Sequence, residues 1–107
     1  MSTFDKREDG FEAKFAHEES LKFKAHARRN RALGLWAAQK LGLSAEEATT
    51  YAQSLIEADL GEAGDEDVYA KLKADFEAKG LDISEHRIRR TMEDLLAESL
   101  EAIKAGG

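Results

Sequence analysis

The sequence predicts an all-α protein: a four-helix bundle whose long first helix carries an N-terminal arm. Three observations favour this fold. The 107 residues include no proline, so nothing forces a break inside a helix. Apolar residues recur at helical spacing, and glycines separate the segments that carry them. Charged residues make up 36% of the chain, so the core must be slim.

Residues 1–41 form the long first helix, and side chains placed at steps of about 100° define two apolar zones along it. Phe4, Phe11 and Phe15 fall on one line of the helix. Further along, this line crosses charged residues before it reaches the second zone, which consists of Leu33, Trp36 and Ala37 with Phe23 and Leu41 at its flanks. We expect the second zone to belong to the core.

The phenylalanine zone has no obvious place in that core, because the later helices already supply enough apolar residues for so small a bundle. Each exposed phenylalanine would forgo about 2 kcal/mol of burial, so a partner is the natural explanation. The alternative is that the zone folds back onto the bundle. Gly10 weakens a helix there by about 1 kcal/mol. We therefore expect an exposed or partly disordered arm over residues 1–18, helical when bound, and a bundle domain over residues 19–105.

Three further helices are predicted after Gly42, which can end the first helix in the left-handed conformation. Ser44 and Glu47 have the spacing of a capping box at the start of the second helix. We expect Asp65 to cap the third helix and residues 82–85 to cap the fourth. The predicted core positions are Ala48, Tyr51, Ala52, Leu55, Ile56, Val68, Leu72, Phe76, Ile88, Met92, Leu95, Leu96, Leu100 and Ile103.

Three arginines within four positions raise the question of nucleic-acid binding. A helix that follows nucleic acid would gather its cations on one face. Here Lys24, Arg28 and Arg31 share one side of the helix, whereas Arg29 points nearly the opposite way. Residues 32–107 hold eight Lys/Arg against sixteen Asp/Glu, and such an acidic body repels nucleic acid. We therefore expect a protein partner and no nucleic acid.

Arg29 also lies within the apolar side of the first helix, between Ala25 and Leu33. A buried guanidinium must be paired. We expect a structural ion pair between Arg29 and a carboxylate of the acidic body.

No catalytic, metal or cofactor site is predicted. The acidic patch at Glu62, Asp65, Glu66 and Asp67 lacks the ligand spacing of a helix-loop-helix calcium site, and the macrodipole of a helix start explains it better. The three histidines match no ligand pattern and are expected to face solvent. The chain has no cysteine, no phosphate-binding loop, no apolar run of membrane-spanning length and no signal-peptide pattern.

Several unusual blocks of sequence carry a family resemblance. They are F-D-x-R-E at 4–8, F-E-x-K-F-A at 11–16, A-R-R-N at 27–30, L-W-A-A at 35–38 and A-G-D-E-D-V at 63–68. In these blocks the chain resembles, from end to end, the zeta subunit of alphaproteobacterial F-type ATP synthases.

The resemblance implies an inhibitor subunit and no enzymatic activity. In that family the arm enters a catalytic interface between the alpha and beta subunits, lodges against the gamma rotor stalk, and blocks ATP hydrolysis while leaving synthesis largely free. The four-helix bundle anchors the subunit. The expected partner-binding residues are Phe4, Asp5, Lys6, Arg7, Glu8, Phe11, Lys14 and Phe15, and the expected structural residues are Arg29, Leu33 and Trp36.

The resemblance also implies a cytoplasmic protein, associated with the cytoplasmic face of membrane-bound ATP synthase without inserting into the membrane, and a monomer when free. The alternative is a stand-alone helical module that binds another protein, or a nucleotide between its helices.

Overall fold

The computed structural model describes the backbone of residues 3–106 and the side chains of residues 20–106. The chain forms four helices and, within the described residues, no strand: α1 (Thr3–Leu41), α2 (Ala45–Ala58), α3 (Asp65–Ala78) and α4 (Glu85–Lys104). The predicted fold class, an all-α bundle of four helices with a long first helix, is confirmed. None of the described helices combines the length and the apolarity that crossing a membrane requires.

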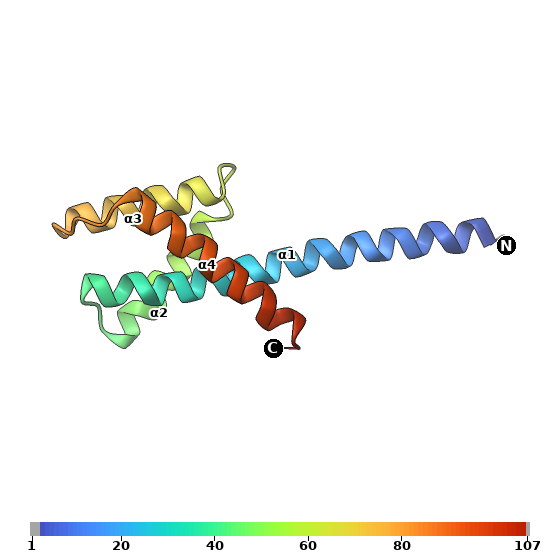
Figure 1. The fold of residues 1–107 in the computed structure, drawn as a ribbon, viewed down its shortest axis with the longest axis horizontal. Coiled ribbons are helices and arrows are strands. Elements are labelled where there is room, and N and C mark those ends of the chain that lie inside the picture. Colours follow the sequence, from blue (N-terminus) through green and yellow to red (C-terminus); the bar gives the residue numbers. More distant parts are fainter. Residues whose placement is uncertain (1–2, 107) are drawn as a thin grey trace.

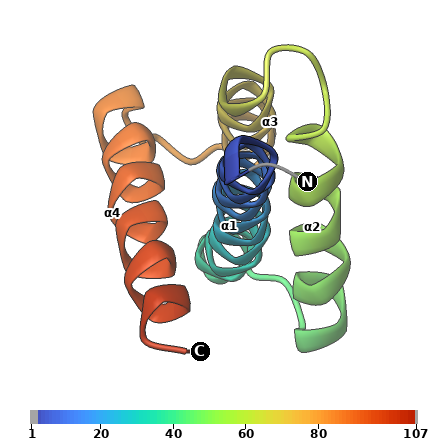
Figure 2. The ribbon, with the colours of Figure 1, turned by 90° about the vertical axis from the view of Figure 1, so that its right-hand side faces the viewer.

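Helix α1 gives the molecule its elongated shape. Its 39 residues correspond to about 58 Å of helix, and the molecule measures 64 × 26 × 22 Å. Its C-terminal half packs between α2 and α4, while its N-terminal half extends beyond the other three helices (Figure 1). Figure 2 looks along α1 from its N-terminal end and shows α2 and α4 on opposite sides of it. The exposure expected for the arm is thus seen in the path of the backbone.

The core joins the C-terminal half of α1 to all three other helices. Leu33 is fully buried, and the half-buried indole of Trp36 packs edge-on against Phe76 with 5.7 Å between ring centroids. The main cluster of buried core residues is Leu33, Ala37, Leu41, Leu55, Val68, Tyr69, Leu72, Phe76, Ile88 and Met92. Four alanines are also buried, namely Ala25, Ala38, Ala48 and Ala52. Tyr69 was not predicted. Six predicted core positions are only partly buried, namely Tyr51, Ile56, Leu95, Leu96, Leu100 and Ile103.

Phe23 corrects one prediction, because its side chain is 65% exposed instead of flanking the core. It lies about 80° around the helix from Leu33. It lines two open grooves, one beside Ile56 and one beside Ile103, so the neighbouring helices cover only part of the ring. A large aromatic ring is therefore presented to solvent at the base of the arm.

Local signals set most of the helix ends. Gly42, with φ of 74°, ends α1 in the left-handed conformation that glycine adopts without strain. The capping box of α2 is confirmed: the Ser44 hydroxyl accepts from the Glu47 amide, and the Glu47 carboxylate accepts from the Ser44 amide.

The predicted cap of α3 is wrong, whereas the stretch predicted to cap α4, residues 82–85, does contain the cap of that helix. The residue before α3 is Gly64, which has no side chain to cap with, and Asp65 is the first helical residue. The Asp65 carboxylate is turned to Arg29 of α1. Helix α4 is capped by Ser84, whose hydroxyl accepts from the Arg87 amide.

Gly34 marks a close approach between α1 and α2, because a β-carbon there would collide with the Cα atom of Ala52. Gly34→Ala would gain about 1 kcal/mol of helix propensity. It would also force the two helix backbones apart, at a cost of about 1–3 kcal/mol. We expect a net loss in the free energy of unfolding, measured by urea titration with circular dichroism. A variant more stable than the parent would contradict this close packing.

Candidate functional site

The eight predicted partner-binding residues, from Phe4 to Phe15, all lie in the N-terminal half of α1. Their backbone is helical and belongs to the segment that extends beyond the bundle (Figure 1). Their side chains lie outside the described residues. What the structure does describe is how the base of this segment is fixed to the bundle.

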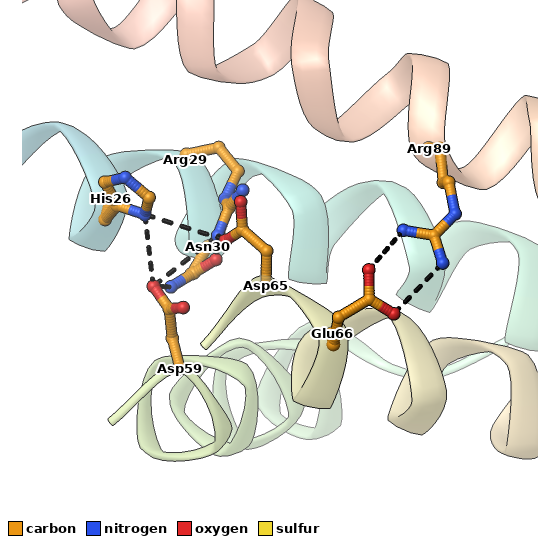
Figure 3. Close-up of polar contacts among 7 residues, drawn as sticks. All are labelled: His26, Arg29, Asn30, Asp59, Asp65, Glu66 and Arg89. Atoms are coloured by element: carbon orange, nitrogen blue, oxygen red, sulfur yellow. Dashed lines mark hydrogen bonds and ion pairs between the residues drawn. The ribbon is translucent and has the colours of Figure 1, made fainter. Parts of the chain in front are cut away.

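A polar cluster fixes α1 to the loop between α2 and α3 (Figure 3). We call it the anchor cluster, and it consists of His26, Arg29, Asn30, Asp59 and Asp65. Arg29 is its centre, with only 1% of its side chain exposed. Its Nη2 atom donates to Asp65 Oδ1 at 2.7 Å and to Asp59 Oδ2 at 3.5 Å, and its Nε atom donates to Asn30 Oδ1 at 2.8 Å. The buried guanidinium is therefore paired with two carboxylates.

Asn30 and His26 contact the same carboxylates. The Asn30 amide donates from Nδ2 to Asp59 Oδ2 at 2.9 Å. His26 Nδ1 lies 3.3 Å from Asp59 Oδ2 and 3.8 Å from Asp65 Oδ1. The expectation that all three histidines face solvent is wrong for His26, which is partly buried; His86 is exposed, and His17 lies outside the described side chains.

The spacing of these residues explains how one helix meets two others. Residues 26, 29 and 30 stand at i, i+3 and i+4, so their side chains share one side of α1. Asp59 directly follows α2, and Asp65 begins α3, so the two carboxylates hold both ends of the intervening loop. Together with the core contacts of Leu33, Ala37 and Leu41, this contact holds α1 in place and so sets the direction in which its N-terminal half leaves the bundle.

This contact favours the charged form of Asp65. Burial disfavours its ionised form, but the hydrogen bond and the charge of Arg29, together with the charge of His26, outweigh burial and lower the pKa of Asp65. Asp65 is therefore an anion at neutral pH. The ion pair with Arg29 is present under physiological conditions.

A second link joins α3 to α4. The guanidinium of Arg89 donates to both carboxylate oxygens of Glu66, at 2.8 and 3.1 Å, and to Glu85 at 2.8 Å. It also stacks 4.0 Å from the ring centroid of Tyr69. These hydrogen bonds and the charge of Arg89 lower the pKa values of Glu66 and Glu85. Asp65 and Glu66, two members of the acidic patch, are thus ion-pair partners as well as helix-start charges.

His26, Asp59 and Asp65 each offer one ligand atom within 4.8 Å of the others, a spacing that suits a metal ion. However, the Arg29 guanidinium already supplies positive charge to both carboxylates. A divalent cation would have to compete with it. The arrangement is that of an ion-pair network.

A groove of about 440 Å³ lies beside the anchor cluster, lined in part by Lys22, Phe23 and Leu60.

Comparison with known families gives one match along almost the whole chain. The model of the family described as ATPase inhibitor subunit zeta matches residues 1–102. The chain belongs to this zeta family. A structure solved in solution by NMR is 39% identical in sequence, with a TM-score of 0.70, and the match covers 81% of this chain and 99% of that one. No curated protein sequence matches the chain.

Membership of the zeta family supports a role as an inhibitor that associates with ATP synthase, and suggests a protein without catalytic activity of its own. Two of the sequence blocks that carry the resemblance meet in space. A-R-R-N supplies Arg29 and Asn30 to the anchor cluster, and A-G-D-E-D-V supplies Asp65 and the partner of Arg89, Glu66. Asp59 and His26 lie outside these blocks. The spacing of His26 with Arg29 and Asn30 was the only signal in the sequence that could have included the histidine.

Proposed function

We propose that this protein inhibits ATP hydrolysis by inserting its arm, residues 1–18, into the head of F-type ATP synthase. The arm enters a catalytic interface between the alpha and beta subunits and lodges against the gamma rotor stalk. The observation that carries the proposal is the path of α1, a helix that continues beyond the bundle while being fixed to it at residues 26–30 (Figure 1). A bound arm on a rigid helix can resist rotation because the bundle cannot swing freely around it.

The length and composition of the arm suit this role. The sixteen helical residues from Thr3 to Glu18 reach about 24 Å, which is enough to enter a cleft between subunits. The line of Phe4, Phe11 and Phe15 offers apolar surface for burial, and Lys6, Arg7 and Lys14 offer charge to carboxylates of the interface. Asp5 and Glu8 belong to the same segment and would face basic groups of the partner.

The proposed partner determines where in the cell the protein acts. A protein with this activity works at the cytoplasmic face of membrane-bound ATP synthase, and it is a monomer when free. Its net charge of −6 disfavours binding to nucleic acid or to an anionic membrane surface.

Replacing two arm phenylalanines, Phe11→Asp with Phe15→Asp, tests the proposal. If both rings are buried in the enzyme, the variant loses about 4 kcal/mol of binding, roughly 1,000-fold in affinity. Its melting temperature should barely change, because the arm extends beyond the bundle (Figure 1). The measurements are inhibition of ATP hydrolysis by the purified synthase head and thermal melting by circular dichroism.

The matched control, Ala13→Asp with Ser20→Asp, adds the same two charges on the side of the helix opposite the phenylalanine line. This control should inhibit far better than the phenylalanine variant. A large drop in the melting temperature of the phenylalanine variant would instead support an arm that folds back onto the bundle.

A further inference from the structure

Helix α1 is a basic element in an acidic protein. Residues 20–45 contain six Lys/Arg and no Asp/Glu, whereas residues 46–107 contain seven Lys/Arg and sixteen Asp/Glu. Among the described side chains, Arg29 is already ion-paired with Asp59 and Asp65 in the anchor cluster. Lys40 lies 5.2 Å from the centroid of the Trp36 ring. Three of the four remaining cations in residues 20–41 form a separate surface.

Three of them make up what we call the basic face: Lys24, Arg28 and Arg31. They stand at i, i+4 and i+7, so they share one side of α1, and all three side chains are exposed. None lies within 4.0 Å of a carboxylate among the described side chains, unlike Arg29, Arg89 and Arg90. The sequence itself prevents local pairing, since no acidic residue stands three or four positions from any of them.

An apolar wall accompanies the basic face. A groove of about 480 Å³ runs between α1 and the C-terminal end of α4, and Phe23 and Ile103 line it together with Lys24, Arg28 and Arg31. Phe23 is 65% exposed, and it is the ring that the sequence placed in the core. A surface that combines an uncovered aromatic ring with three cations suits an acidic, partly apolar protein segment.

We propose that the basic face and Phe23 bind an acidic segment of the ATPase that the arm inhibits. This inference rests on the proposed function, and it names the surface and the partner chemistry for the anchoring role that the family resemblance implies for the bundle. Lys24 lies six residues beyond the end of the arm, about 9 Å along the same helix, so a partner that surrounds the arm has surface close by. Charge complementarity orients the bundle, since the acidic remainder of the protein repels the same segment.

A protein segment fits this surface better than a lipid bilayer does. The groove has walls from two helices, α1 and α4, which suits a chain lying between them and not a flat surface. An anionic bilayer would face the acidic remainder of the protein over a wide area, whereas a narrow acidic segment meets only the basic face and its groove. The three cations act over short range, where a protein carboxylate can contact each of them.

The test compares charge reversals in the full-length protein. Arg28→Glu with Arg31→Glu should weaken inhibition of ATP hydrolysis by about tenfold or more, and should reduce the dependence of inhibition on salt concentration. Lys73→Glu with Lys79→Glu changes the net charge equally at two other exposed lysines, and should weaken inhibition by less than about threefold. Arg28→Lys with Arg31→Lys keeps the charge and should inhibit almost like the parent. Circular dichroism checks that all variants remain folded.

Cross-linking identifies the occupant. A carbodiimide joins lysine amines to carboxylates in direct contact, so Lys24 should become linked to an Asp or Glu of an ATPase subunit.

Four results would overturn the proposal. An equal loss of inhibition in the arginine and the lysine charge-reversal variants would show that only the net charge of the protein matters. Binding to phosphatidylglycerol vesicles is measured for the same variants. If Arg28→Glu with Arg31→Glu abolished vesicle binding but left inhibition unchanged, the face would be assigned to a membrane. Cross-links between two copies of this chain, in place of links to the enzyme, would assign it to self-association. If the unmodified protein does not inhibit, the proposed function itself fails, which the first three results leave intact.

Discussion

Deletion of residues 1–15 is expected to abolish inhibition of ATP hydrolysis and to leave the bundle folded. The deleted segment carries all eight residues that we assign to partner binding, including the three arm phenylalanines. Among the described side chains, the first buried residue is Ala25, and the anchor cluster begins at His26. The core therefore keeps every contact that the structure describes. Hydrolysis by the purified synthase head measures inhibition, and thermal melting measures stability.

A second variant controls for the bulk and charge of the arm. Residues 1–15 in scrambled order keep the same composition but lose the phenylalanine line. If inhibition requires the three phenylalanines on one side of the helix, the protein with the scrambled arm should inhibit no better than the deletion. A truncated protein that inhibits as well as the full chain would show that the arm is not the inhibitory element.

Arg29→Met is expected to cost about 3 kcal/mol in the free energy of unfolding, and to lower the melting temperature by about 15 °C. Methionine fills similar space but leaves Asp59 and Asp65 facing each other without the guanidinium. The Asp59 side chain is only 11% exposed, so water cannot fully replace the lost hydrogen bond. Urea titration at neutral pH would measure the change.

Arg31→Met is the matched control, because Arg31 is exposed on the same helix and pairs with no carboxylate among the described side chains. It should change stability by no more than about 0.5 kcal/mol. Asp65→Asn should cost less in the Arg29→Met background than in the parent, because the two groups interact directly. A fully stable Arg29→Met protein would mean that the anchor cluster does not hold α1 in place.

The sequence by itself determined the number of helices and most of their ends. Apolar spacing, the capping box of Ser44 and Glu47, and the glycine at position 42 all act between residues a few positions apart, so they can be read without knowing the fold. The need of Arg29 for a buried partner also followed from its place on the apolar side of α1. These features depend on local chemistry alone.

Only the tertiary structure decided which groups meet. It assigned Asp65 to Arg29 instead of to a helix cap, brought His26 to two carboxylates, and left Phe23 uncovered at the base of the arm. Each of these outcomes depends on where α2, α3 and α4 lie against α1, and contacts between residues about 30 positions apart leave no periodic trace in the sequence. The position of a side chain around its own helix is local, whereas its burial and its ion-pair partner are properties of the packed bundle.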